Sequence, residues 1–139
     1  MSNVIKISEA ASIAIHAMIL LAGDSDRTVS SKEMAGKLGS SEAHLAKVMQ
    51  RLAKAGLVGS TRGPKGGFVL KRSTQEVSLL DVYEAIEGPL EETNCLLGHP
   101  ICNGGRCIFG DLLKKTDRQA REYLSGKKLS DLECSLNGT

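Results

Sequence analysis

The segment from residue 30 to residue 72 most constrains how this 139-residue chain can fold. A short helix is predicted over residues 32–38 and a longer one over residues 42–55, because serines that can cap a helix precede each and a glycine follows each. In the longer helix apolar residues recur at spacings of three and four, so one side packs and the other stays free. Two helices joined by a tight turn at Gly39 form a helix-turn-helix pattern.

A β-hairpin is predicted directly after the second helix. Apolar residues at 57–58 and 68–70 flank the turn sequence Thr-Arg-Gly-Pro-Lys-Gly-Gly of residues 61–67. A further helix is predicted over residues 79–87 and a longer one over residues 108–124. We therefore expect a mainly α-helical fold with a small β-hairpin, in which a winged helix-turn-helix domain is followed by a long helix.

An apolar helix is predicted before this unit, from Ser8 to about residue 21, with a polar stripe of Glu9, Ser12 and His16 on one face. Its uncharged stretch is too short to span a bilayer, and no charged segment typical of a signal peptide precedes it. We expect a buried helix in a cytoplasmic protein with no membrane partner.

The first half of the chain is basic and the second half is acidic. Residues 1–72 carry 11 Lys/Arg and 5 Asp/Glu, whereas residues 73–139 carry 7 and 11. The helix-turn-helix and hairpin segment, residues 31–72, holds nine basic residues against two acidic ones. A basic module of this layout indicates double-stranded DNA as the partner.

The candidates for DNA contact follow from how a winged helix binds. Its second helix enters the major groove, and a cationic wing reaches the backbone or the narrow minor groove. The candidates are Ser40, Ser41, His44, Lys47 and Arg51 on the helix, and Arg62, Lys65 and Gly66 on the wing. The serines could instead be caps only, and the cations could be solvated only.

Three cysteines, Cys95, Cys102 and Cys107, lie within thirteen residues of a loop rich in glycine and proline. In a chain without an export signal, clustered cysteines are more often metal ligands than disulfides. Three thiolates fall one ligand short of the four that a soft metal centre takes. An iron–sulfur cluster, a structural zinc site and redox-active thiols all fit this spacing.

The chain resembles the Rrf-two family of bacterial winged-helix regulators, which includes iron–sulfur and nitric-oxide sensors. The matching motifs are residues 14–18 (Ala-Ile-His-Ala-Met), 51–58, 62–68 (Arg-Gly-Pro-Lys-Gly-Gly-Phe), 78–82, the three-cysteine loop and residues 129–132. The resemblance covers nearly the whole chain. It implies a homodimer, in which the long helix crosses to the partner, and an iron–sulfur cluster in each loop that controls DNA binding.

The resemblance also bears on the fourth ligand, which in similar members comes from the first helix of the other subunit. His16 is the candidate for that position, and Ser12, His99 and Cys134 are alternatives. A neutral imidazole raises the potential of a cluster, as in Rieske centres. A 2Fe-2S cluster is favoured over 4Fe-4S. The cysteine spacings of six and four depart from the family's usual spacings near five.

We therefore expect three parts: a DNA-binding domain over residues 1–87, a cluster-binding loop over residues 88–107, and a dimerisation helix and tail over residues 108–139. The predicted function is that of a transcription regulator, a repressor and not an enzyme. It binds a pseudo-palindromic operator as a homodimer and senses redox state, cluster supply or nitric oxide. The alternatives are a small iron–sulfur electron-transfer protein and a structural zinc-binding interaction module.

Overall fold

The computed structural model describes residues 7–24, 27–63, 66–91, 95–97, 101 and 107–132. Four residues named above, Lys65, His99, Cys102 and Cys134, lie outside these ranges. The described elements are α1 (Glu9–Gly23), α2 (Ser31–Leu38), α3 (Glu42–Lys54), β1 (Val58–Thr61), β2 (Gly67–Leu70), α4 (Leu79–Glu87), α5 (Leu112–Gly126) and α6 (Leu129–Leu132).

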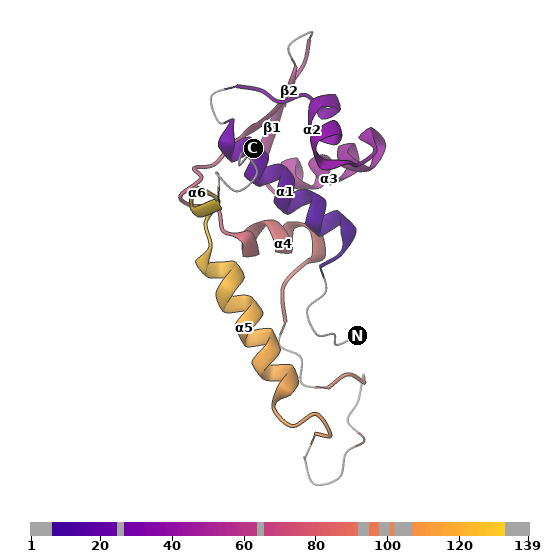
Figure 1. The fold of residues 1–139 in the computed structure, drawn as a ribbon, viewed down its shortest axis with the longest axis vertical. Coiled ribbons are helices and arrows are strands. Elements are labelled where there is room, and N and C mark those ends of the chain that lie inside the picture. The colour runs from indigo at the N-terminus through magenta and orange to yellow at the C-terminus, as the bar shows by residue number, and fades with distance from the viewer. Residues whose placement is uncertain are drawn as a thin grey trace.

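The mainly helical fold with a small hairpin is confirmed. Strands β1 and β2 pair antiparallel, with Val58 opposite Leu70 and Thr61 opposite Gly67. Figure 1 shows this hairpin at one end of the long axis, whereas α5 begins near the other end. The helix-turn-helix and the wing therefore lie far from the segment that follows the cysteine loop.

Helix α1 forms the centre of the core. Its apolar residues extend nearly all the way round the helix, and it packs against α2, α3, α4, α6 and β2. Burial on several sides explains why this helix has so few polar positions. Of the polar stripe predicted on it, Glu9 and His16 are exposed and Ser12 is half-buried.

The turn between α2 and α3 has the backbone conformation that a glycine favours. Gly39 lies in the left-handed region (φ 68°), and the N–H of Ser40 donates to the carbonyl of Ala35 at 3.1 Å. Ser41 then caps α3, because its hydroxyl accepts a hydrogen bond from the N–H of His44 at 3.1 Å. The helix-turn-helix predicted from the sequence is thus held by local bonds at both helix ends.

Helix α5 begins at Leu112, four residues later than the sequence pattern predicts. Residues 107–111 form turns, because Gly110 adopts a left-handed conformation (φ 60°) that interrupts the helix. As a result Ile108 is 84% exposed and does not belong to the buried edge of the helix. That edge is formed by Leu113 and Leu124, which are buried.

Backbone hydrogen bonds join the segment directly after α5 to the start of α4. The carbonyl of Lys127 accepts from the N–H of Leu79, and the N–H of Leu129 donates to the carbonyl of Val77, both at 3.0 Å. Leu129 is fully buried in the main core. Residues 127–132 therefore return to the winged-helix body, and the division into three parts stays a prediction.

Within the described ranges, none of the helices is long and apolar enough to cross a membrane.

Candidate DNA interface and cysteine loop

The exposed side of α3 carries three of the residues predicted to contact DNA. Ser41 and Lys47 are exposed, and His44 lies beside them with its side chain 36% exposed. The Nδ1 atom of His44 lies 4.0 Å from a carboxylate oxygen of Glu9 in the first turn of α1. The opposite side of α3 is buried in the core, so the exposed side is the one free to approach a duplex.

Two predicted contact residues on the same helix-turn-helix point elsewhere. The hydroxyl of Ser40 is buried and has no hydrogen-bond partner among the described residues, so it would have to rotate outward to reach DNA. The guanidinium of Arg51 donates a hydrogen bond to the carbonyl of Ile86, in the last turn of α4. Neither direction follows from the spacing of residues along α3.

The wing presents Arg62 to solvent at the end of β1. Gly63 has a positive φ of 107°, and its carbonyl accepts the N–H of Gly66 at 2.9 Å. A Cβ added to Gly66 would lie 2.5 Å from the carbonyl oxygen of Thr61. The glycine at this position is therefore required by the turn itself, apart from any contact with DNA.

The base of the wing is fastened to the segment between α1 and α2. Val29 forms two backbone hydrogen bonds with Phe68, of 3.0 and 2.8 Å. The approach is so close that a Cβ on Gly67 would lie 2.5 Å from the carbonyl oxygen of Val29. This pairing was not predicted from the sequence, although the double glycine of the wing motif is a sign of close backbone contact.

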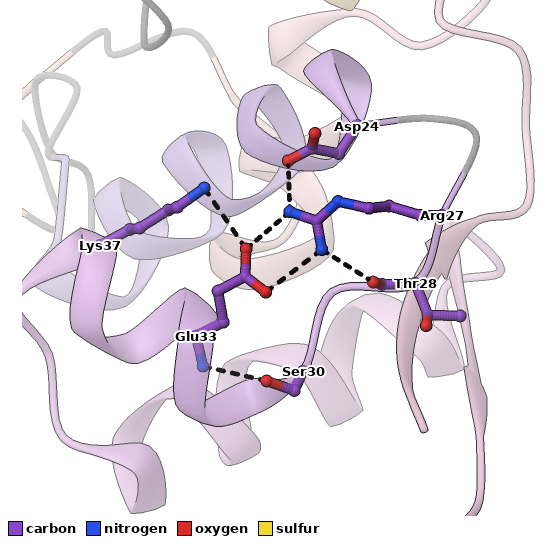
Figure 2. Close-up of polar contacts among 6 residues, drawn as sticks. All are labelled: Asp24, Arg27, Thr28, Ser30, Glu33 and Lys37. Atoms are coloured by element: carbon purple, nitrogen blue, oxygen red, sulfur yellow. Dashed lines mark hydrogen bonds and ion pairs between the residues drawn. The ribbon is translucent and has the colours of Figure 1, made fainter. Parts of the chain in front are cut away.

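An ion-pair network holds the same α1–α2 segment (Figure 2). Arg27 binds both carboxylate oxygens of Glu33, at 2.7 and 3.2 Å, and also reaches Asp24 at 3.2 Å. Lys37 approaches Glu33 at 3.4 Å. The hydrogen bonds from Arg27 and Lys37 hold the pKa of Glu33 at about 2, below its ordinary value of 4.5. Two cations of the basic front half are thus engaged with carboxylates.

The polar stripe on α1 orients the imidazole of His16. Its Nδ1 atom lies 2.6 Å from the backbone carbonyl of Ser12 and 3.5 Å from the hydroxyl of the same residue. Because a carbonyl can only accept, Nδ1 donates in this bond, which leaves Nε2 as the ring nitrogen that can bind a metal. A histidine held in this tautomer on an exposed helix face is suited to bind a metal through Nε2.

Two of the three loop cysteines are described, and both Cys95 and Cys107 are half-buried free thiols. The sulfur of Cys107 accepts a hydrogen bond from the N–H of Phe109 at 3.4 Å. Amide donors of this kind stabilise thiolates and tune iron–sulfur clusters. Within the described ranges, no three His, Cys, Asp or Glu residues gather into a metal site, and Cys102 lies outside those ranges.

The start of the cysteine loop is tied to α4. The N–H of Leu90 donates to a carboxylate oxygen of Glu84 at 2.7 Å, and the side chain of Leu90 is buried. A small cavity of about 150 Å³ separates this point from α5 and is lined by Leu90, Glu91, Asp117, Arg118 and Arg121. The sequence offered no sign of the Glu84 contact, because it depends on how the chain leaves α4.

Residues 7–134 match the model of the Rrf2 family, described as an iron-dependent transcriptional regulator. The chain belongs to the Rrf2 family. Its relatives include an HTH-type transcriptional regulator of Aquifex aeolicus, 30% identical over 90% of this chain and 89% of that protein. They also include IscR of Pectobacterium carotovorum, 32% identical over 72% of this chain. This match spans 61% of that IscR's length.

Solved structures of Rrf2 proteins have the same fold. CymR, the global cysteine regulator of B. subtilis, matches with a TM-score of 0.79 and 26% identity, over 94% of this chain and 98% of CymR. IscR of T. potens matches with a TM-score of 0.73 and 28% identity, over 92% and 85%. Winged-helix regulators of the Rrf2 family bind DNA, are typically dimeric and are not enzymes, so the chain is a transcription regulator.

Proposed function

We propose that this Rrf2 protein is a cytoplasmic repressor that binds a pseudo-palindromic operator as a homodimer. An iron–sulfur cluster in the loop of residues 88–107 controls that binding and senses redox state, cluster supply or nitric oxide. The observation that carries the proposal is that one chain combines a winged helix with a loop of three cysteines, one of them already in an amide–sulfur hydrogen bond.

The residues available fit such a cluster. Cys95, Cys102 and Cys107 supply three soft thiolate ligands, and the N–H of Phe109 offsets negative charge on one sulfur. His16 supplies the fourth ligand through Nε2, because the Ser12 carbonyl holds the proton on Nδ1. Its exposed position on α1 suits donation to the loop of the other subunit. The cluster that we favour is 2Fe-2S, which when bound would supply a redox-sensitive charge beside the dimer helix.

Metal analysis of the anaerobically purified chain tests the cluster. We expect iron and acid-labile sulfide in equal amounts, with visible absorption that His16→Ala alters and Ser12→Ala does not. Zinc without sulfide would instead indicate a structural site. An identical spectrum and midpoint potential in His16→Ala would exclude His16 as a ligand. Unchanged far-ultraviolet circular dichroism shows that the variant remains folded.

The DNA interface is formed by the exposed side of α3 and by the wing. We assign Ser41, His44 and Lys47 to the major groove, with Ser40 nearby at the helix start. Arg62, Lys65 and Gly66 lie on the wing, where a cation can enter the narrow minor groove.

Replacing the wing cation tests this interface. We expect Arg62→Ala to weaken binding about tenfold to a duplex selected from a random library with the wild-type protein. Arg72→Ala is the matched control, because Arg72 lies beyond β2 and approaches Glu76 at 3.6 Å. Equal affinities of Arg62→Ala and the wild type would remove Arg62 from the interface.

A second candidate is a regulator that needs no cluster, and the likeness to CymR favours it. In that case the loop cysteines act as thiols, and regulation follows the cysteine supply of the cell. Metal-free protein that binds the selected duplex as tightly as protein isolated anaerobically would support this candidate over the cluster.

A further inference from the structure

The carboxyl end of α4 is capped by a residue of α3, the recognition helix that we assign to the major groove. The last carbonyls of any α-helix lack partners within the helix and favour a nearby cation. In α4 the carbonyl of Glu84 accepts the N–H of Gly88 at 2.9 Å, and the carbonyl of Ile86 accepts the guanidinium of Arg51. Arg51 thus joins the last turn of α3 to the point where α4 ends.

The cysteine loop starts immediately after this cap. Gly88 leaves the helix with a positive φ of 84°, and the N–H of Leu90 returns to the carboxylate of Glu84 at 2.7 Å. Leu90 is buried, so the first residues of the loop are fixed against α4. Four residues separate Leu90 from Cys95, the first cysteine.

A second contact joins the end of α4 to the start of α1. The hydroxyl of Ser8 donates to the carboxylate of Glu87, and the next residue, Glu9, lies 4.0 Å from His44 of α3. The end of α4 therefore contacts both the recognition helix and the helix that carries His16. The contact of α4 with α3 is made directly by Arg51.

We propose that Arg51 is a positioning residue that couples the start of the cysteine loop to the recognition helix, in place of the DNA contact predicted from the sequence. The inference rests on the proposed DNA-binding function. Arg51 is exposed, but its bond to the carbonyl of Ile86 directs the guanidinium toward the end of α4. Arg51 therefore fixes the orientation of α3 relative to α4, and a conformational change at residues 88–91 is transmitted through it to α3.

Amide hydrogen exchange and salt-dependent binding test this role. In Arg51→Gln we expect the amides of Gly88, Leu90 and Glu91 to exchange about five- to tenfold faster than in the wild type, because their support at α4 is lost. Adding the selected duplex should slow exchange at these amides in the wild type and not in the variant, because coupling between two sites is reciprocal. The slope of log affinity against log salt should stay at the wild-type value.

Lys47→Gln is the matched control on the same helix. As a phosphate or base contact it should reduce the salt slope by about 0.9 and leave exchange at residues 88–91 unchanged. Arg51→Lys keeps a cation with fewer donors and should give intermediate exchange rates at residues 88–91. If Arg51→Gln folds poorly, these rates test whether Arg51 supports the start of the loop.

A salt slope reduced by about 0.9 in Arg51→Gln, or unchanged exchange at residues 88–91, would overturn the proposal and return Arg51 to the DNA interface. If the wild-type chain selects no duplex, the proposed DNA-binding function fails. In that event faster exchange in Arg51→Gln still supports the cap, and unchanged exchange rejects it.

Discussion

The contact between Gly67 and Val29 predicts that a single methyl group on the wing will destabilise the whole domain. A Cβ at residue 67 would lie 2.5 Å from the carbonyl oxygen of Val29 and 2.6 Å from its carbonyl carbon, whereas ordinary contacts begin at 3.4 Å. Relief requires a shift of about 0.9 Å between two backbone segments, and neither is a flexible side chain.

The loss in the free energy of unfolding depends on how the two backbone segments respond to the added methyl group. If the segments separate, the Val29–Phe68 hydrogen bonds of 2.8 and 3.0 Å lengthen beyond bonding range, at about 0.5–1.5 kcal/mol each. If they stay together, the overpacked contact costs about 1–3 kcal/mol. Both responses predict that Gly67→Ala lowers the free energy of unfolding by about 2 kcal/mol.

Urea unfolding followed by circular dichroism, at one fixed protein concentration, measures the effect. The matched control is Gly59→Ala on β1, where the new Cβ would meet the flexible side chain of Lys71 at 3.2 Å and the side chain of Val69 at an ordinary 4.0 Å. We expect that control to change the free energy of unfolding by less than about 0.5 kcal/mol. Equal free energies of unfolding for Gly67→Ala and Gly59→Ala would show that the contact with Val29 does not exclude a side chain at residue 67.

Three further predictions concern other parts of the fold. Because the pKa of Glu33 is lowered, its ion-pair network stabilises the protein fully above pH 4.5 and ceases to do so as the pH falls toward 2. Glu33→Gln should therefore reduce the dependence of the melting temperature on pH between pH 4.5 and pH 2. An unchanged pH profile would contradict this. Ser78→Ala removes a capping box with Asp81 and should cost about 1 kcal/mol in urea unfolding, whereas Ser73→Ala, in the turn before α4, should cost less. Leu129→Ala should cost about 2–5 kcal/mol, and a negligible cost would show that α6 is not part of the core.

Local sequence signals predicted most of the helical framework correctly. The caps at Ser30, Ser41 and Ser78 bind backbone N–H groups within the next three residues, and the turn at Gly39 needs only its own left-handed conformation. The all-round apolar composition of α1 predicted its central place in the core. These features depend on residues that are close together in the sequence, so they can be predicted from it.

The site could be predicted only in part, because residue type does not determine where a flexible side chain points. Lys47 and Arg62 are exposed where the winged-helix pattern expects them. Ser40 and Arg51 occupy predicted positions, yet the hydroxyl of Ser40 is buried and Arg51 caps α4. The spacing along α3 assigns a residue to a helix face, but the neighbouring helix decides what its side chain binds.

Sequence patterns predicted helices α1 to α4, the hairpin, the basic character of the winged helix and the three cysteines in one loop, but not the start of α5 or the helix α6. Three contacts could be seen only in the folded chain: Val29 pairs with the wing, Leu129 is buried in the core and Arg51 binds the end of α4. They could not be predicted because the residues in each contact lie far apart in the sequence. These contacts join residues 35 or more positions apart in sequence, and such contacts form only when the whole core brings the segments together.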